Sequence, residues 1–168
     1  MNIGGSMTGA LFTGDDNRYR LALWRIWGKA PALLFIGLNP STANGIKDDP
    51  TIRRLAGYAR AWGYGGLYAG NLFSLVTPDP GELFARASEE TPGGPNDAAL
   101  KTMQKLSGLT LLGWGHYGSY AGKRPEEVLA LLGEPVYCLA VTKNGEPGHP
   151  LYLKKELRPR LYVRGGKP

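Results

Sequence analysis

Three polar residues carry side chains suited to hydrogen-bonding chemistry. Asn39, Asn71 and His149 each come just after an apolar segment. An asparagine amide presents a donor and an acceptor together, as reading the edge of a nucleobase requires. A histidine can donate to an oxygen that becomes negative as a bond breaks. These residue types indicate recognition of a nucleobase and stabilisation of a leaving group.

Several other chemistries are disfavoured by what the chain lacks. It has a single cysteine, Cys138, which excludes an intramolecular disulfide and a cysteine-based metal cluster. It has two histidines and no carboxylate at metal-ligand spacing. Neither a nucleophile elbow nor a phosphate-binding GxxxxGK[ST] loop occurs. We therefore expect no metal and no cofactor.

Alternating apolar segments and amphipathic segments position these residues. The apolar runs 32–36, 67–72, 109–112 and 136–141 read as buried strands. Helices are expected after Asp49, after Asn96 or Asp97, and from Pro125. The order β-α-β-α-β-α-β predicts a three-layer α/β/α sandwich with a mostly parallel central sheet. Since a helix joins the first two strands, we expect them to be parallel neighbours, with Asn39 and Asn71 opening into one crevice.

The remaining segments define the domain. Residues 1–10 are expected to be a disordered leader or an expression remnant, and 11–168 a single α/β domain. The alternation of charged and apolar residues from Arg18 to Leu23 favours a strand. An antiparallel edge strand is one option for it, and a helix is the competing interpretation. Residues 74–95 are expected to form a long irregular loop, with residues 81–87 as the one candidate for regular structure within it, and such a loop is typical of a functional or disordered segment.

Charge and composition bound the partners. The formal net charge is +6, and residues 153–168 hold six basic residues against one acid. A basic face suggests a polyanion, although ordinary solubilising charge explains it as well. No run approaches the ~18 apolar residues of a membrane span. The single cysteine suggests the cytoplasm. We expect a monomer with no membrane partner.

Five motifs recur in order in a bacterial family that is defined only as a domain of unknown function. They are GLNPST, GYGGLYAGNLF, GGPND, LLGWG and TKNGEPGHPLY. This resemblance covers nearly the whole chain after Leu11. The same motifs are more weakly similar to the uracil-DNA glycosylase superfamily, especially its mismatch-specific uracil/thymine branch. That likeness implies a uracil-DNA glycosylase-like fold and DNA as the partner.

The second resemblance also implies roles for individual residues. Asn39 would orient the attacking water, Asn71 would recognise the base, and His149 would stabilise the departing base. The residues implied to line the substrate site are Gly37, Leu38, Pro40, Ser41, Thr42 and Asn71. Asp49 is a separate candidate, which would act on water if it faces the pocket. The resemblance implies that the residues after His149, namely Pro150, Leu151 and Tyr152, contact the duplex. The basic residues Lys143, Lys154, Lys155 and Arg158 are candidates for holding phosphates. Residues 42–49 contain no aromatic ring for base stacking.

Three functions remain open from the sequence. The first is a DNA glycosylase that flips a damaged, mismatched or modified base and hydrolyses its N-glycosidic bond. The second is a non-catalytic protein that binds nucleic acid or a modified base. The third is an N-glycosidase acting on nucleosides or nucleotides. Structural roles also stay open: Asn39 as a turn residue, Asn71 as a strand-end cap, and Asp49 as a helix-start acid.

Overall fold

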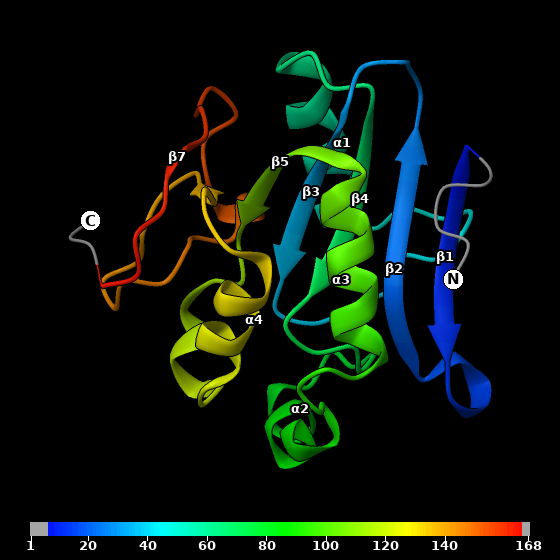
Figure 1. Cartoon of the computed structure of the whole chain (residues 1–168), viewed down its shortest axis with the longest axis vertical. Helices are drawn as coiled ribbons and strands as arrows, with labels where there is room; N and C mark the ends of the chain where they lie inside the picture. Colours follow the sequence, from blue (N-terminus) through cyan, green and yellow to red (C-terminus); the bar gives the residue numbers. More distant parts are fainter. Residues whose placement is uncertain (1–6, 166–168) are drawn as a thin grey trace.

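A seven-stranded sheet forms the centre of the computed structural model, which describes residues 7–165 (Figure 1). The strand order is β1-β2-β4-β3-β5-β6-β7. The strands are β1 Thr8–Thr13, β2 Tyr19–Ile26, β3 Ala32–Gly37, β4 Gly66–Asn71, β5 Ser107–Leu112, β6 Tyr137–Cys138 and β7 Arg160–Leu161.

The sheet is mixed, so the expectation of a mostly parallel sheet was wrong. Strands β4, β3, β5 and β6 run parallel, but β1, β2 and β7 pair antiparallel with their neighbours. The β1–β2 connection is short and contains positive φ values at Gly14, Asp16 and Asn17. A short turn of this kind can join only antiparallel strands, because a parallel pair needs a long crossover.

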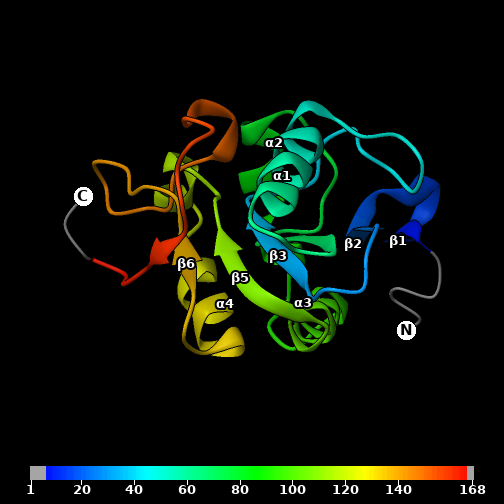
Figure 2. The same ribbon diagram turned by 90° about the horizontal axis from the view of Figure 1, so that it is seen from above.

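Four α-helices flank the sheet in the described part of the chain, and all of them have proline in the first turn. They are α1 Pro50–Ala61, α2 Pro80–Ala85, α3 Pro95–Lys105 and α4 Arg124–Leu132. Seen from above, α1 covers one face of the sheet, while α3 and α4 cover the other (Figure 2). Each face has its own apolar core, so the layers are those of an α/β/α arrangement. No helix between residues 7 and 165 is long and apolar enough to cross a membrane.

The central strands agree with the sequence, while the flanking segments differ. Strands β3 and β4 are parallel neighbours, and Gly37 pairs with Asn71. The expected strand 136–141 shortens to β6, because the chain turns back where Val141 bridges Pro147. The loop expected at 74–95 contains α2, which overlaps the candidate stretch 81–87, and a 3-10 turn.

The start of the chain also differs from the expectation. Strand β2 is internal rather than an edge, because β1 pairs along its outer side. Strand β1 begins at Thr8 and so includes the last three residues of the expected leader. Residues 1–6 of that leader lie outside the described residues.

A buried ion pair fixes the carboxyl end of β4. Arg124 donates from Nη2 to Asp97 at 2.6 Å and from Nε to the carbonyl of Leu72 at 2.7 Å. The Asn96 amide donates to the carbonyls of Asn71 and Leu72. Through Asn96 and Asp97, the GGPND motif thus helps to satisfy the backbone carbonyls at the end of β4, where the chain leaves the sheet.

We expect Asp97→Asn to lower the free energy of unfolding by roughly 3 kcal/mol, because it leaves the Arg124 charge buried without its partner. Glu127→Gln is the matched control. Its carboxylate approaches the same arginine at 3.8 Å but is 38% exposed, so its loss should cost less than about 1 kcal/mol. Urea unfolding of the three proteins measures both values. Equal effects of the two substitutions would contradict this account of the pair.

Candidate functional site

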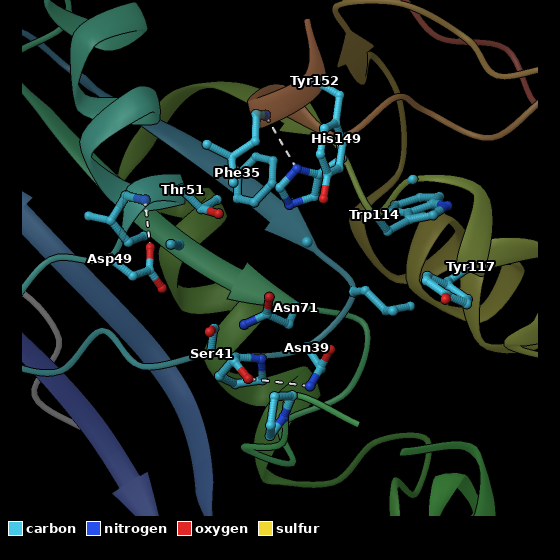
Figure 3. A pocket seen from close by; sticks show the side chains of 18 of the residues that line it. Phe35, Asn39, Ser41, Asp49, Thr51, Asn71, Trp114, Tyr117, His149 and Tyr152 are labelled. Atoms are coloured by element: carbon cyan, nitrogen blue, oxygen red, sulfur yellow. Dashed lines mark hydrogen bonds between the residues drawn. The ribbon is translucent and has the colours of Figure 1, made fainter. Parts of the chain in front are cut away.

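A pocket of about 750 Å³ opens at the carboxyl ends of β3 and β4. Asn39, Asn71 and His149 all line it, although they lie far apart in the sequence. In Figure 3, Asp49 and His149 lie on opposite sides of the pocket, with Asn71 and Asn39 below them in the view. The carboxyl edge of a parallel sheet is where α/β proteins place their ligand sites.

The Asn71 side chain is buried in this pocket without a protein partner. It is 5% exposed, and its amide nitrogen makes no hydrogen bond in the described part of the chain. Its carbonyl oxygen lies so close to Gly37 that a Cβ there would approach it at 2.8 Å. A buried donor without a partner costs about 1–3 kcal/mol, so Asn71 is prepared for a ligand that accepts a hydrogen bond.

The Asn39 side chain is held by the loop that follows β4. Its amide nitrogen donates to the carbonyls of Thr77 at 2.7 Å, Leu75 at 3.2 Å and Pro40 at 3.3 Å. These bonds fix the plane of the Asn39 amide. They leave its side-chain oxygen as the only polar atom of the side chain that is still available. Asn39 therefore has a structural role as a loop anchor and can offer the pocket an acceptor.

His149 offers the pocket a donor. Its Nδ1 accepts the backbone N–H of Leu151 at 3.3 Å, which places the proton of the neutral ring on Nε2. Burial lowers the pKa of His149 below its usual range, and the nearby Asp49 opposes this shift only in part. The ring is consequently neutral at pH 7, with an N–H available to a ligand.

Asp49 is the only carboxylate among the pocket-lining residues. It lies at the start of α1, where its Oδ1 accepts the N–H of Ile52 at 2.9 Å. The expected helix-cap role is therefore real. Because one oxygen is sufficient for the cap, the other remains available to a ligand or a water.

Arg20 lines the same pocket and was not a sequence candidate. It is 4% exposed and donates from Nη1 to the Ala43 carbonyl at 2.7 Å. Burial lowers the pKa of Arg20 to about 10, with Asp49 raising it and Arg25 lowering it further. The group stays charged at neutral pH. An alternating pattern predicts that an arginine faces solvent. In the structure both faces of β2 are covered, so Arg20 is buried instead.

Several aromatic side chains line the pocket, among them Phe35, Trp114 and Tyr152. Phe35 lies between two glycines, since a Cβ at Gly37 or Gly113 would approach its ring at 3.0 Å or 2.6 Å. Tyr152 is 86% exposed, and its ring lies 5.4 Å from that of His149. Trp114 is buried and donates to Glu146 at 2.6 Å.

The remaining candidates divide between the pocket and the outer surface. The pocket-lining ones are Gly37, Leu38, Pro40, Ser41, Leu151 and Tyr152. Thr42 and Pro150 are not among its lining residues, and Pro150 is buried. Lys143, Lys154, Lys155 and Arg158 are exposed and outside the pocket lining. Across residues 7–165, no cluster of three metal-ligating side chains occurs.

This arrangement defines an α/β protein with a pocket at the carboxyl edge of a mixed sheet, lined by both apolar and polar side chains. The chain belongs to the family described as protein of unknown function DUF1643, whose sequence profile matches residues 18–151. The match contains the first four motifs and most of the fifth. No curated protein and no solved structure matches the chain.

We expect Gly37→Ala to destabilise the protein by about 1–3 kcal/mol, because its Cβ overlaps the Asn71 oxygen and the Phe35 ring. Gly57→Ala is the matched control. Gly57 is exposed in α1 and has no heavy atom within 4 Å of a Cβ, so alanine should stabilise by roughly 0.5–1 kcal/mol. Urea unfolding distinguishes the two signs. A neutral or stabilising Gly37→Ala would show that the close approach is unnecessary.

The half-buried, neutral His149 should make stability depend on pH. The unfolded chain binds the histidine proton more tightly, so the contribution is complete above about pH 6.5 and decreases as the pH falls toward the lower folded pKa. His149→Gln should remove this decrease. The difference in unfolding free energy between the two proteins, followed from about pH 7.5 to 5, measures it. An NMR midpoint for the His149 ring at or above 6.5 would refute the assignment.

Proposed function

We propose that the protein hydrolyses the N-glycosidic bond of a damaged, mismatched or modified base in DNA. The observation that supports this most is the meeting of an amide, an imidazole and a carboxylate in one pocket. These are Asn71, His149 and Asp49, all of which line it. Each is buried or half-buried and retains a polar atom that no residue of the described chain engages.

The proposed recognition step uses Asn71. Its unpartnered amide nitrogen donates to a carbonyl oxygen on the base edge, and its side-chain oxygen accepts from a ring N–H. The face of Phe35 lies near enough to line the slot for a flat base. A flipped base would repay part of its unstacking cost through these contacts.

The proposed chemical step is heterolysis of the bond between the sugar C1′ and the base nitrogen. The bonding electron pair leaves with the base, and the His149 Nε2–H stabilises the resulting negative oxygen. A water attacks the electron-poor C1′ and gives its proton to Asp49, which is free to accept on the oxygen not used by the cap. The products are a free base and an abasic sugar.

Asn39 has a narrower role in this scheme than its likeness to the glycosylase motif implies. Its amide nitrogen is occupied by three backbone carbonyls, so only its oxygen can orient the water. Asn39 is not itself a base. The proton acceptor in the proposal is therefore Asp49, the carboxylate of the pocket.

The proposed contact with DNA is made by the segment after His149. Leu151 lines the pocket, and Tyr152 is exposed beside its opening, where an apolar wedge would fill the gap left by the flipped base. Lys143, Lys154, Lys155 and Arg158 are exposed and available to phosphates. A non-catalytic base-binding protein would use the same contacts, and it differs only in the absence of turnover.

We expect base release from at least one duplex in a panel that carries uracil, thymine mismatches and hypermodified pyrimidines, with abasic sites revealed by alkali. Asp49→Asn and His149→Ala should each reduce the rate by roughly a hundredfold or more. Asparagine keeps the α1 cap, so the first variant should stay folded. Glu156→Gln removes an exposed acid outside the pocket and should leave the rate unchanged.

Two results would count against this function. Binding to DNA without any abasic product would favour the non-catalytic alternative. Release of base from free nucleosides or nucleotides, with none from duplexes, would favour the small-substrate N-glycosidase. If Asn39→Ala matches the wild type, then Asn39 acts only as the loop anchor.

A further inference from the structure

Arg20 differs from the other buried arginines of the described chain. Arg25 lies 2.8 Å from the carboxylate of Asp48, and Arg124 lies 2.6 Å from that of Asp97. Arg20 forms no salt bridge with any described residue. Its charge is therefore buried without a partner in contact, which is a costly arrangement unless something else neutralises it.

The free atoms of the guanidinium lie on one edge. Nη1 is bound to the Ala43 carbonyl, whereas Nε is buried without a partner. Nη2 likewise makes no hydrogen bond within residues 7–165. An arginine edge of two adjacent N–H groups matches the paired oxygens of a phosphate or carboxylate. Asp49 is near enough to favour the charged arginine but is not in contact, so it does not occupy that edge.

We infer that the pocket contains a phosphate subsite at Arg20. This inference rests on the proposed function, and it specifies that the ligand is a phosphorylated nucleoside unit rather than a free nucleoside or base. The unit would place its base edge on Asn71 and its phosphate on Arg20, since both residues line one cavity. Its volume of about 750 Å³ falls within the range of sites for such ligands.

Two sources share this chemistry. The phosphate can belong to a nucleoside monophosphate, or it can be the phosphodiester beside a nucleotide flipped out of a strand. Both present oxyanions to the same arginine. Because the proposed contact joins Arg20 to the phosphate alone and does not involve the base, inorganic phosphate is a suitable first probe.

The first experiment measures thermal unfolding of the full chain in inorganic phosphate against chloride at equal ionic strength. A ligand that binds only the folded state raises the midpoint. We expect the phosphate-specific rise in wild type, a smaller one in Arg20→Lys, and none in Arg20→Met. Lys101→Met removes an exposed charge outside the pocket and should keep the wild-type rise. Stabilisation that is absent in wild type, or equal in Arg20→Met, would overturn the subsite.

The second experiment identifies the source by calorimetric titration. A pyrimidine nucleoside 5′-monophosphate and a short single-stranded oligonucleotide are compared with the matching nucleoside. A charge-assisted contact predicts roughly tenfold tighter binding for whichever phosphate form is the source. Arg20→Met should abolish that advantage and leave nucleoside binding unchanged. An advantage that survives the substitution would overturn the assignment of the phosphate to Arg20.

The two proposals can fail separately. Loss of the phosphate effect in Arg20→Met without any detectable base release would retain the subsite and reject the glycosidase. Base release that is unaffected by Arg20→Met, at subsaturating substrate, would retain the glycosidase and reject the subsite. Since Arg20→Met replaces a buried charge with an apolar side chain of similar length, its fold should be preserved, and its unfolding midpoint without phosphate tests this.

Discussion

The parallel pairing of β3 with β4 is the constraint on which the site depends. Its last pair places Gly37 opposite Asn71. The missing side chain at Gly37 gives the Asn71 oxygen and the Phe35 ring their space. A shift of one residue would turn Asn71 toward the opposite face of the sheet, because side chains alternate along a strand. The lack of a side chain at Gly37 and the pairing register of β3 with β4 thus determine whether the Asn71 amide reaches the pocket.

Hydrogen bonds to backbone carbonyls then hold the segments that surround this pair. Arg124 and Asn96 bind the carbonyls where β4 ends, and Asn39 binds two carbonyls further along the same loop. Glu146 accepts from Trp114 and Arg164, and so fixes the segment that leads to His149. These polar side chains therefore bind backbone carbonyls that hydrogen bonds within a helix or a sheet would satisfy in regular secondary structure. Much of the chain around the pocket is loop, and these hydrogen bonds connect it to the sheet and to α3 and α4.

The sequence predicted the parts whose signal is local. The apolar segments before Asn39 and Asn71 and the helices α1, α3 and α4 could be read directly, because strand burial and helix starts leave patterns within a few residues. Strand β6 shortened because the bridge between Val141 and Pro147 turns the chain back. The antiparallel flanks and the burial of Arg20 depend on which strands become neighbours, and composition does not show that.

The basic C-terminal segment shows how pairing changes a charge argument. Arg164 binds Glu126 at 2.8 Å and Glu146 at 3.3 Å, so its charge supports the fold and is not free for a polyanion. Arg20 shows the opposite: it lies within a strand of mostly apolar residues, yet its charge lacks a contacting partner. Net charge counts both arginines equally. A ligand meets the charges that the fold leaves unpaired, and of these two arginines only Arg20, inside the pocket, has such a charge.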